Sequence, residues 1–255
     1  MDEKMKNKKG QIAIWVILAV VLMASIILFF ALERGPFLAE RKGFNPEQFI
    51  KTCTSDAVID AAEKMLPQGG FIAPTNFKLY SDIKVAYLCE NVGYFKPCIN
   101  QHPMLINEIR DEIKNYIQPK IEQCFKDMKT EAEKEGNSVE MGAMELAVSV
   151  APKRIYVDIS RKVAITQEGS AQAFEKLNVE VIHPLYDLAS VAVAIASEEA
   201  KNCYFEYVGY MILYPQFRIE VNTRTDSTRI YTITDKNSGK VMNIAIRGCA
   251  ISGAI

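Results

Sequence analysis

The hydrophobic pattern opens with an unbroken apolar run, Ile12–Leu32, in which Ser25 is the only polar side chain. As an α-helix this run would rise about 32 Å, close to the roughly 30 Å thickness of a bilayer's hydrocarbon core. A helix satisfies its own backbone hydrogen bonds, which lipid requires. The pattern therefore predicts a single transmembrane helix over residues 12–32, preceded by a polar, basic leader over residues 1–11.

Residues 33–136 are predicted to form a helical region that carries four of the cysteines. Asn45-Pro46-Glu47 is typical of a helix start, and Pro67 with Gly69-Gly70 is typical of its end. After Pro103 a long helix to about residue 135 is expected, in which Pro119 predicts a kink or a restart. Its apolar residues recur every four positions: Leu105, Ile109, Ile113, Ile117, Ile121 and Phe125.

Between these helices, residues 79–89 alternate in the manner of one or two short strands that end at Cys89. The segment ENVGYFKP, residues 90–97, reads as a turn, and Cys98 follows it. We therefore expect a short hairpin here.

Residues 137–255 are predicted to form a mainly antiparallel sheet domain with one packed helix. Alternating segments indicate strands over residues 144–150, 154–160, 162–167, 176–182, 218–223, 229–235 and 240–247. Residues 187–201 form a helix that is apolar on most sides and must pack under the sheet, with Glu198, Glu199 and Lys201 facing water. The fold class predicted for the whole chain is α+β.

Composition narrows the function classes. The formal net charge is −1 with 24% charged residues, which gives no electrostatic basis for nucleic-acid binding. The chain beyond the apolar run has the mixed composition of a folded protein.

Six cysteines all follow the apolar run, and no C-x-x-C pair occurs among them. Disulfides in an oxidising compartment are favoured over buried reduced thiols in a cytoplasmic domain, and a metal site is the least favoured reading. Cys53 and Cys124 lie near the apolar faces of their helices, so we pair them. Cys89 with Cys98 would close the hairpin. Cys203 follows the last helix and Cys249 the last strand, so these two are paired as well.

The leader contains four lysines, but four basic residues also lie within about twenty residues of the other end of the run. Charge alone therefore does not decide the topology.

The segment Lys8-Lys9-Gly10-Gln11-Ile12-Ala13 resembles the class III signal peptide of archaeal pilin-like proteins. The resemblance covers only the N-terminal region. It implies a prepilin-type peptidase that cuts after Gly10, leaving Gln11 as the new terminus, and it implies that the C-terminal domain lies outside the cell. Trp15 stands at the fifth mature position, where many bacterial type IV pilins carry a glutamate that supports assembly. An uncleaved anchor is the alternative.

A second resemblance concerns the remainder of the chain. A helical cysteine followed by QGGFI (residues 68–72) and IEQC (residues 121–124) is similar to uncharacterised membrane-anchored archaeal proteins. It implies a lineage and no activity.

Candidate chemistry is sparse. His102 and His183 each precede a proline and read as turn or element-end residues, and no cluster with metal-ligand spacing accompanies them. Asp235, Asn237 and Gly239 have some character of a calcium loop, but their spacing fits a hairpin turn better. An aromatic cluster is expected in the core or at an interface: Tyr204, Phe205, Tyr207, Tyr210 and Tyr214. We predict no catalytic residue, no metal and no cofactor, hence no enzyme.

Three functions remain. The first is a single-pass, membrane-anchored, extracytoplasmic structural or interaction protein, such as a pilin-like surface component. The lipid bilayer is its first partner, and it would associate with itself or with other envelope proteins. The alternative is a membrane-tethered ligand-binding module of the cell envelope. An exterior hydrolase ranks last.

Overall fold

The computed structural model describes Trp15 and residues 17–29, 44–91, 93, 96–167 and 170–248. The chain divides into two compact units, residues 1–45 and residues 46–255, each of which is described by itself. The predicted leader, residues 1–11, lies outside the described residues.

In the first unit, Trp15 and residues 17–29 are helical, and their apolar side chains are exposed. The Ser25 hydroxyl donates to the Val21 and Leu22 carbonyl oxygens at 2.7 and 3.0 Å, so its hydrogen-bonding capacity is satisfied within the helix. Within the described part of the chain, no helix combines the length and apolar character needed to cross a bilayer. Since both ends of Ile12–Leu32 lie outside the described residues, the transmembrane helix stays a prediction.

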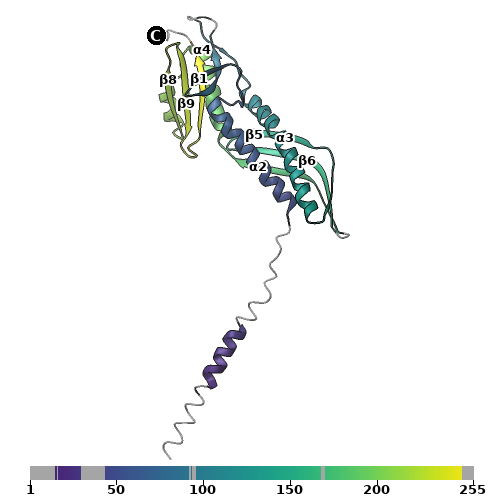
Figure 1. Ribbon diagram of the computed structural model, residues 1–255. Coiled ribbons are helices and arrows are strands. Elements are labelled where there is room, and N and C mark those ends of the chain that lie inside the picture. Colours follow the sequence, from purple (N-terminus) through teal and green to yellow (C-terminus); the bar gives the residue numbers. More distant parts are fainter. Residues whose placement is uncertain are drawn as a thin grey trace, which may run out of the picture. The chain divides into compact units, whose positions relative to one another are not determined.

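The second unit is built around a pair of long helices, α2 (Pro46–Met65) and α3 (Leu105–Lys134), drawn together in Figure 1. The predicted start of α2 is confirmed, and the 3₁₀ turn η1 (Leu66–Gln68) follows it. Gly69 then adopts φ 76°, a left-handed conformation that suits glycine at a helix end. The four-residue repeat of α3 is confirmed as its packing face, because Ile109, Ile113, Ile117, Ile121 and Phe125 are all fully buried.

Two sheets complete this unit. The first contains β1 (Phe77–Tyr80), β2 (Ile83–Glu90), β3 (Ile99–Asn100), β8 (Phe217–Thr223), β9 (Thr228–Asp235) and β10 (Val241–Arg247). Its order is β1-β2-β10-β9-β8, with β3 added to β2. All pairs are antiparallel except β2 with β10, which is parallel.

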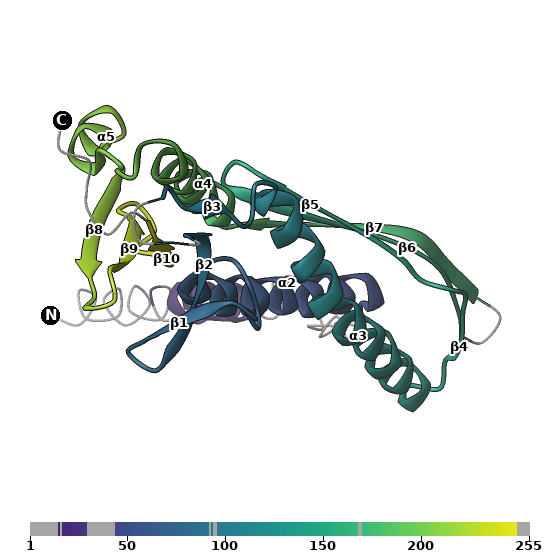
Figure 2. The same cartoon turned by 90° about the horizontal axis from the view of Figure 1, so that it is seen from above.

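The second sheet contains β4 (Ser138–Met141), β5 (Glu145–Ala151), β6 (Arg154–Gln167) and β7 (Ser170–Ile182). The long strand β6 pairs with β4 and β5 along one side and with β7 along the other, all antiparallel. Helix α2 packs against β7, and α3 packs against β4 and β5, so both helices pack on this sheet (Figure 2).

The folded unit does not divide at residue 136, where the sequence predicts a boundary. Residues 46–255 form one compact unit, because β2 lies beside β10 in one sheet although they come from opposite sides of that boundary. Helix α4 (Leu185–Asn202) packs on β2, β9 and β10 and also contacts α3 and β5. This confirms the predicted helix under the sheet. The α+β class is likewise confirmed for the described residues.

Strands predicted separately over residues 154–160 and 162–167 form the single strand β6 with a register irregularity between Ser160 and Val163. Arg161, in that irregularity, reaches α3 and donates to both Glu122 carboxylate oxygens at 2.8 and 3.2 Å. Its guanidinium also lies 4.7 Å from the Phe125 ring centre. The bulge thus fastens β6 to α3. A kink or a restart is predicted at Pro119, and of these two the restart does not occur, because α3 continues through Pro119 as one helix.

A first prediction concerns the helix pair. We expect Ile117→Ala to lower the free energy of unfolding by about 2–5 kcal/mol, because it opens a cavity at a fully buried position. Chemical denaturation of the purified chain measures this. Ile212→Ala, at a helical position that is 75% exposed, is the matched control and should change stability by less than about 0.5 kcal/mol. Equal losses in the two variants would contradict the assigned core.

Candidate functional site

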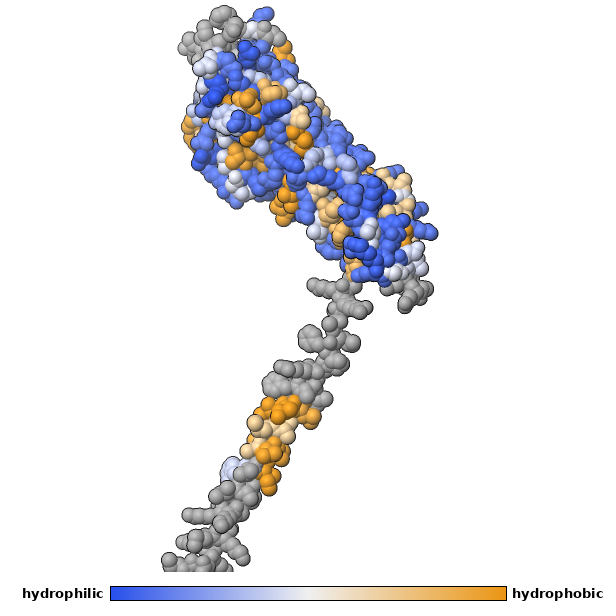
Figure 3. Space-filling model, in the orientation of Figure 1, coloured by the Kyte–Doolittle hydropathy of each residue, from blue (hydrophilic) through white to orange (hydrophobic). Residues whose placement is uncertain are grey.

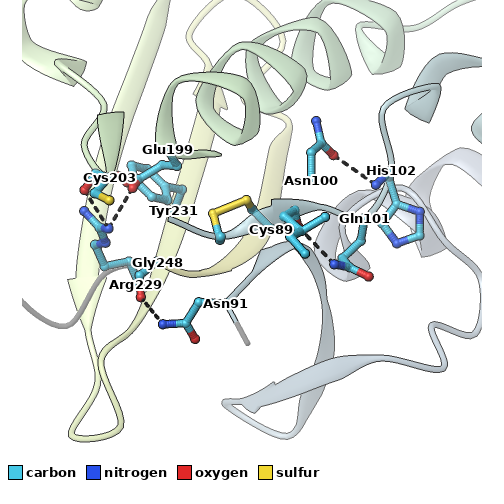
Figure 4. Close-up of a disulfide and its surroundings, with 12 residues drawn as sticks. Cys89, Asn91, Asn100, Gln101, His102, Glu199, Cys203, Arg229, Tyr231 and Gly248 are labelled. Atoms are coloured by element: carbon cyan, nitrogen blue, oxygen red, sulfur yellow. Dashed lines mark hydrogen bonds and ion pairs between the residues drawn. A yellow bond between two sulfur atoms is a disulfide. The ribbon is translucent and has the colours of Figure 1, made fainter. Parts of the chain in front are cut away.

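A group of interacting polar side chains, with Glu199 and Tyr231 buried, lies where α4 ends against β9 (Figure 4). Glu199 of α4 is fully buried, as is Tyr231 of β9 to within 1%. Arg229 lies two residues before Tyr231 on the same strand, so both side chains face α4. Arg229 Nη2 donates to Glu199 Oε2 at 2.7 Å, and the Tyr231 hydroxyl donates to Glu199 Oε1.

Burial controls the electrostatics of this cluster. It raises the pKa of Glu199, against the opposing effects of the Tyr231 hydrogen bond and the Arg229 charge. Burial and the neighbouring carboxylate both raise the pKa of Tyr231. A buried carboxylate is costly unless it is paired, and here both of its oxygens accept a hydrogen bond.

The cluster also holds the last described residues of the chain. Arg229 Nη2 donates to the Cys203 carbonyl oxygen at 3.0 Å, and Cys203 ends α4 with φ 56°. Gly248 lies so close that an added Cβ would stand 2.6 Å from Arg229 Nη2. Asn91 Nδ2 donates to the Gly248 carbonyl oxygen at 2.7 Å. The arrangement therefore holds α4, β9 and the end of β10 together; Glu199 is fully buried in it, whereas the Arg229 side chain stays 15% exposed.

The sequence predicts that Glu199 faces water, and this is wrong, because Glu199 is fully buried in the cluster. The correction follows from helical spacing: Leu188, Val191, Ile195 and Glu199 recur at intervals of three or four residues and share one buried face. That spacing was a usable signal. The approach of Arg229 and Tyr231 depends on the β9 placement and left no local trace in the sequence.

The predicted disulfides are confirmed at two positions. Cys53 of α2 is bonded to Cys124 of α3 across 71 residues, and Cys89 is bonded to Cys98 across 9. Cys203 is also disulfide-bonded. Its predicted partner, Cys249, lies outside the described residues, as do Gly10 and Gln11.

A hollow of about 470 Å³ lies beside His183, between the end of β7 and the β9–β10 turn. Its lining mixes apolar Ile182, Pro184 and Phe217 with polar residues such as Asp187 and Asp235. This size falls within the range of small-molecule sites.

His183 itself is structural. The Leu185 amide donates to its Nδ1 at 3.2 Å, so its Nε2 carries the proton and donates to Glu63 at 3.2 Å. Burial lowers the pKa of His183. Although burial alone would raise the pKa of Glu63, hydrogen bonds from Lys240 and His183 lower it. The imidazole therefore joins β7 to α2 and has no free nitrogen to offer a ligand.

The remaining candidates are also accounted for. Asp235 accepts from Ser238 Oγ at 2.5 Å and from the Ser238 amide at 3.1 Å, which confirms the predicted hairpin turn between β9 and β10. His102 lies between β3 and α3, and its Nδ1 is 2.5 Å from Glu108. Among the residues that the structure describes, no group of three or more His, Cys, Asp or Glu side chains is arranged to hold a metal ion.

The predicted aromatic cluster is divided between core and surface. Phe205 is buried, with its ring 6.3 Å from that of Tyr231, whereas Tyr204 and Tyr214 are about 45% exposed. They flank helix α5 (Tyr207–Leu213), which buries none of its residues and exposes Val208, Ile212 and Leu213.

No known protein family, curated protein or solved structure matches this chain.

A second prediction tests the buried cluster. We expect Arg229→Met to lower the free energy of unfolding by about 3–5 kcal/mol at neutral pH, because Glu199 is left buried without its cation. The loss should shrink under acidic conditions, since protonated Glu199 needs no partner. Denaturation at several pH values measures this. Adding Glu199→Gln should recover part of the loss at neutral pH, and no recovery would contradict the pairing.

Proposed function

We propose that this chain is a single-pass, membrane-anchored, extracytoplasmic structural or interaction protein, with residues 12–32 as its anchor and residues 46–255 outside the cell. The observation that carries the proposal is the disulfide bonding of the folded unit. Cys53–Cys124 and Cys89–Cys98 lie in the same unit, and disulfides persist mainly in oxidising compartments. A domain with such bonds that follows a long apolar segment belongs on the far side of a membrane.

The apolar segment itself supports the proposal, and Figure 3 shows its described residues mostly in the colours of hydrophobic residues. Apart from Ser25 its side chains have no polar atoms, except for the indole nitrogen of Trp15 near one end. The Ser25 hydroxyl is hydrogen-bonded within the helix, so it brings no unsatisfied donor into lipid. Tryptophan is favoured at the bilayer–water boundary, which suits Trp15.

The pilin-like character rests on the leader alone. The resemblance of residues 8–13 to a class III signal peptide supports processing by a prepilin-type peptidase. The exposed apolar residues of α5 support contacts with other envelope components.

The alternative is a membrane-tethered ligand-binding module. It is favoured by the hollow beside His183, whose apolar and polar lining could hold a small molecule. The interaction role remains our conclusion, because it uses both the disulfides and the apolar segment.

A third prediction tests the topology. We expect Ser149→Cys, at an exposed position of β5, to react with a membrane-impermeant maleimide on intact cells, since the disulfide-bonded native thiols give a low background. Lys4→Cys, in the leader, is the matched control; it is labelled in cells that lack a prepilin-type peptidase, so that the leader stays on the chain, and it should react only after lysis. If Ser149→Cys reacts only after lysis, the extracytoplasmic location is wrong.

A fourth prediction tests the leader. In cells that contain a prepilin-type peptidase, the mature chain should begin at Gln11, and Gly10→Val should keep the leader because the cut requires a small residue there. Intact-mass measurement of the purified protein reads out both. Asn7→Val is the control and should be cut normally. An unprocessed wild-type chain would leave a plain signal anchor.

A further inference from the structure

The free edge of strand β7 offers an open template for another strand. β7 pairs with β6 along one side, and no described strand pairs with its other side. Figure 2 shows it along the margin of its sheet. At 13 residues it is long for an edge, and it contains neither proline nor glycine, two of the residues that commonly interrupt strand pairing.

The backbone groups that face outward can be identified. The His183 amide donates to the Lys153 carbonyl oxygen at 3.0 Å, so residue 183 faces β6. Hydrogen-bonding direction alternates along an antiparallel strand. The N–H and C=O groups of Lys176, Asn178, Glu180 and Ile182 therefore point to the free edge.

The exposed side chains of β7, which lie on one face of the sheet, would be complementary between two copies of the strand. In an antiparallel pair of two β7 strands with a twofold axis at Asn178, Lys176 lies opposite Glu180 of the other copy, and Glu180 opposite its Lys176. Phe174 and Ile182 also meet. Ile182 is 80% exposed, the highest value among the described large apolar residues. Moving the axis to Lys176 or Glu180 would place like charges opposite each other.

A hollow lies beside the middle of β7. A hollow of about 320 Å³ lies between β7 and α2, lined on the α2 side by polar residues between Gln48 and Asp56. On the β7 side it is lined by Asn178, Val179 and Glu180. The hollow therefore lies against the stretch of β7 that is centred on Val179.

Strand β8 differs from β7 because backbone amides on its outer side already have partners. β8 is also an edge strand, but the Phe217 amide donates to the Tyr214 carbonyl oxygen at 3.0 Å and the Ile219 amide to Met211 Sδ at 3.1 Å. Helix α5 and the turn after it thus cover the edge of β8. The chain closes that edge and leaves β7 open.

We propose that two copies of this chain associate through their β7 strands, antiparallel about a twofold axis at Asn178. Such an isologous pairing buries the same surface on both copies. It joins the two four-stranded sheets into one continuous sheet. The inference rests on the proposed interaction role, for which it names the partner, but it does not depend on the anchor.

Cross-linking in the full-length, membrane-extracted chain tests the register. Opposite residues in a hydrogen-bonded antiparallel pair have Cα atoms about 5.5 Å apart, within disulfide range. Asn178→Cys should therefore give a disulfide-linked dimer under mild oxidation. Glu180→Cys alone should not, because its two copies would lie about 14 Å apart. Lys176→Cys combined with Glu180→Cys should link again.

Ser149→Cys, exposed on β5, measures random collision. If Asn178→Cys links no more than Ser149→Cys, or if Glu180→Cys links equally well, the proposal is wrong.

Charge exchange provides a second test. Lys176→Glu should raise the dimer dissociation constant about tenfold, since two like-charged pairs replace two opposite ones. Glu180 also pairs with Arg154 of β6 in its own copy. Combining Lys176→Glu with Glu180→Lys and Arg154→Glu should therefore restore association, which a folding defect would not allow. Sedimentation in detergent measures the constant. If the chain is a monomer but Ser149→Cys is labelled on intact cells, the dimer is overturned and the proposed extracytoplasmic location stands. If the chain is a dimer but Ser149→Cys is labelled only after lysis, the location is overturned and the dimer stands.

Discussion

The α2–α3 pair is the constraint on which the folded unit depends. The buried isoleucine face of α3 can leave water only against a partner, and α2 supplies it. The Cys53–Cys124 bond then fixes that contact across 71 residues of sequence, which on the chain-entropy model is worth about 4 kcal/mol. Because α2 also packs on β7 and α3 on β4 and β5, the same pair orients the second sheet. Arg161 repeats the link from the strand side by pairing with Glu122 and covering Phe125.

The first sheet is tied to this base by α4 and by buried polar contacts. Helix α4 covers β2, β9 and β10, which are far apart in the sequence. A purely apolar contact would leave the sliding of a helix over a sheet weakly specified. Glu199 removes that freedom, because its two oxygens are satisfied only when Arg229 and Tyr231 occupy fixed places. A second set of polar contacts involves Glu63 of α2, which pairs with His183 after β7 and with Lys240 before β10. A buried pair of this kind is weak evidence of added stability, but its hydrogen bonds are satisfied only when α4 and β9 keep this relative position.

Local patterns predicted much of this fold. The periodicities of α2, α3 and α4, the breaks at Pro67 and Gly69, and two disulfides followed from residues close in sequence or from matching apolar faces. The errors share a cause in long-range contacts. The parallel pairing of β2 with β10 erased the expected boundary at residue 136, since no local signal records which strands become neighbours. Pro119 did not restart α3, because buried Ile117 and Ile121 on either side hold the helix in place. The charge of Glu199 predicts exposure, but its helical spacing groups it with buried Val191 and Ile195, and the spacing is the signal that agrees with the structure.

Edge strands then connect the fold to its role. A sheet edge exposes a row of backbone donors and acceptors, which soluble proteins usually block. In this unit α5 covers the edge of β8. The same helix exposes Ile212 and Leu213, so it presents an apolar surface. β7 is left without such a cover, although Lys176 and Glu180 place opposite charges on either side of Asn178. Charges of one sign would deter pairing with another copy. Opposite charges instead favour the one register in which Lys176 lies opposite Glu180 of the other copy, as expected if the β7 edge pairs with a second copy of the chain.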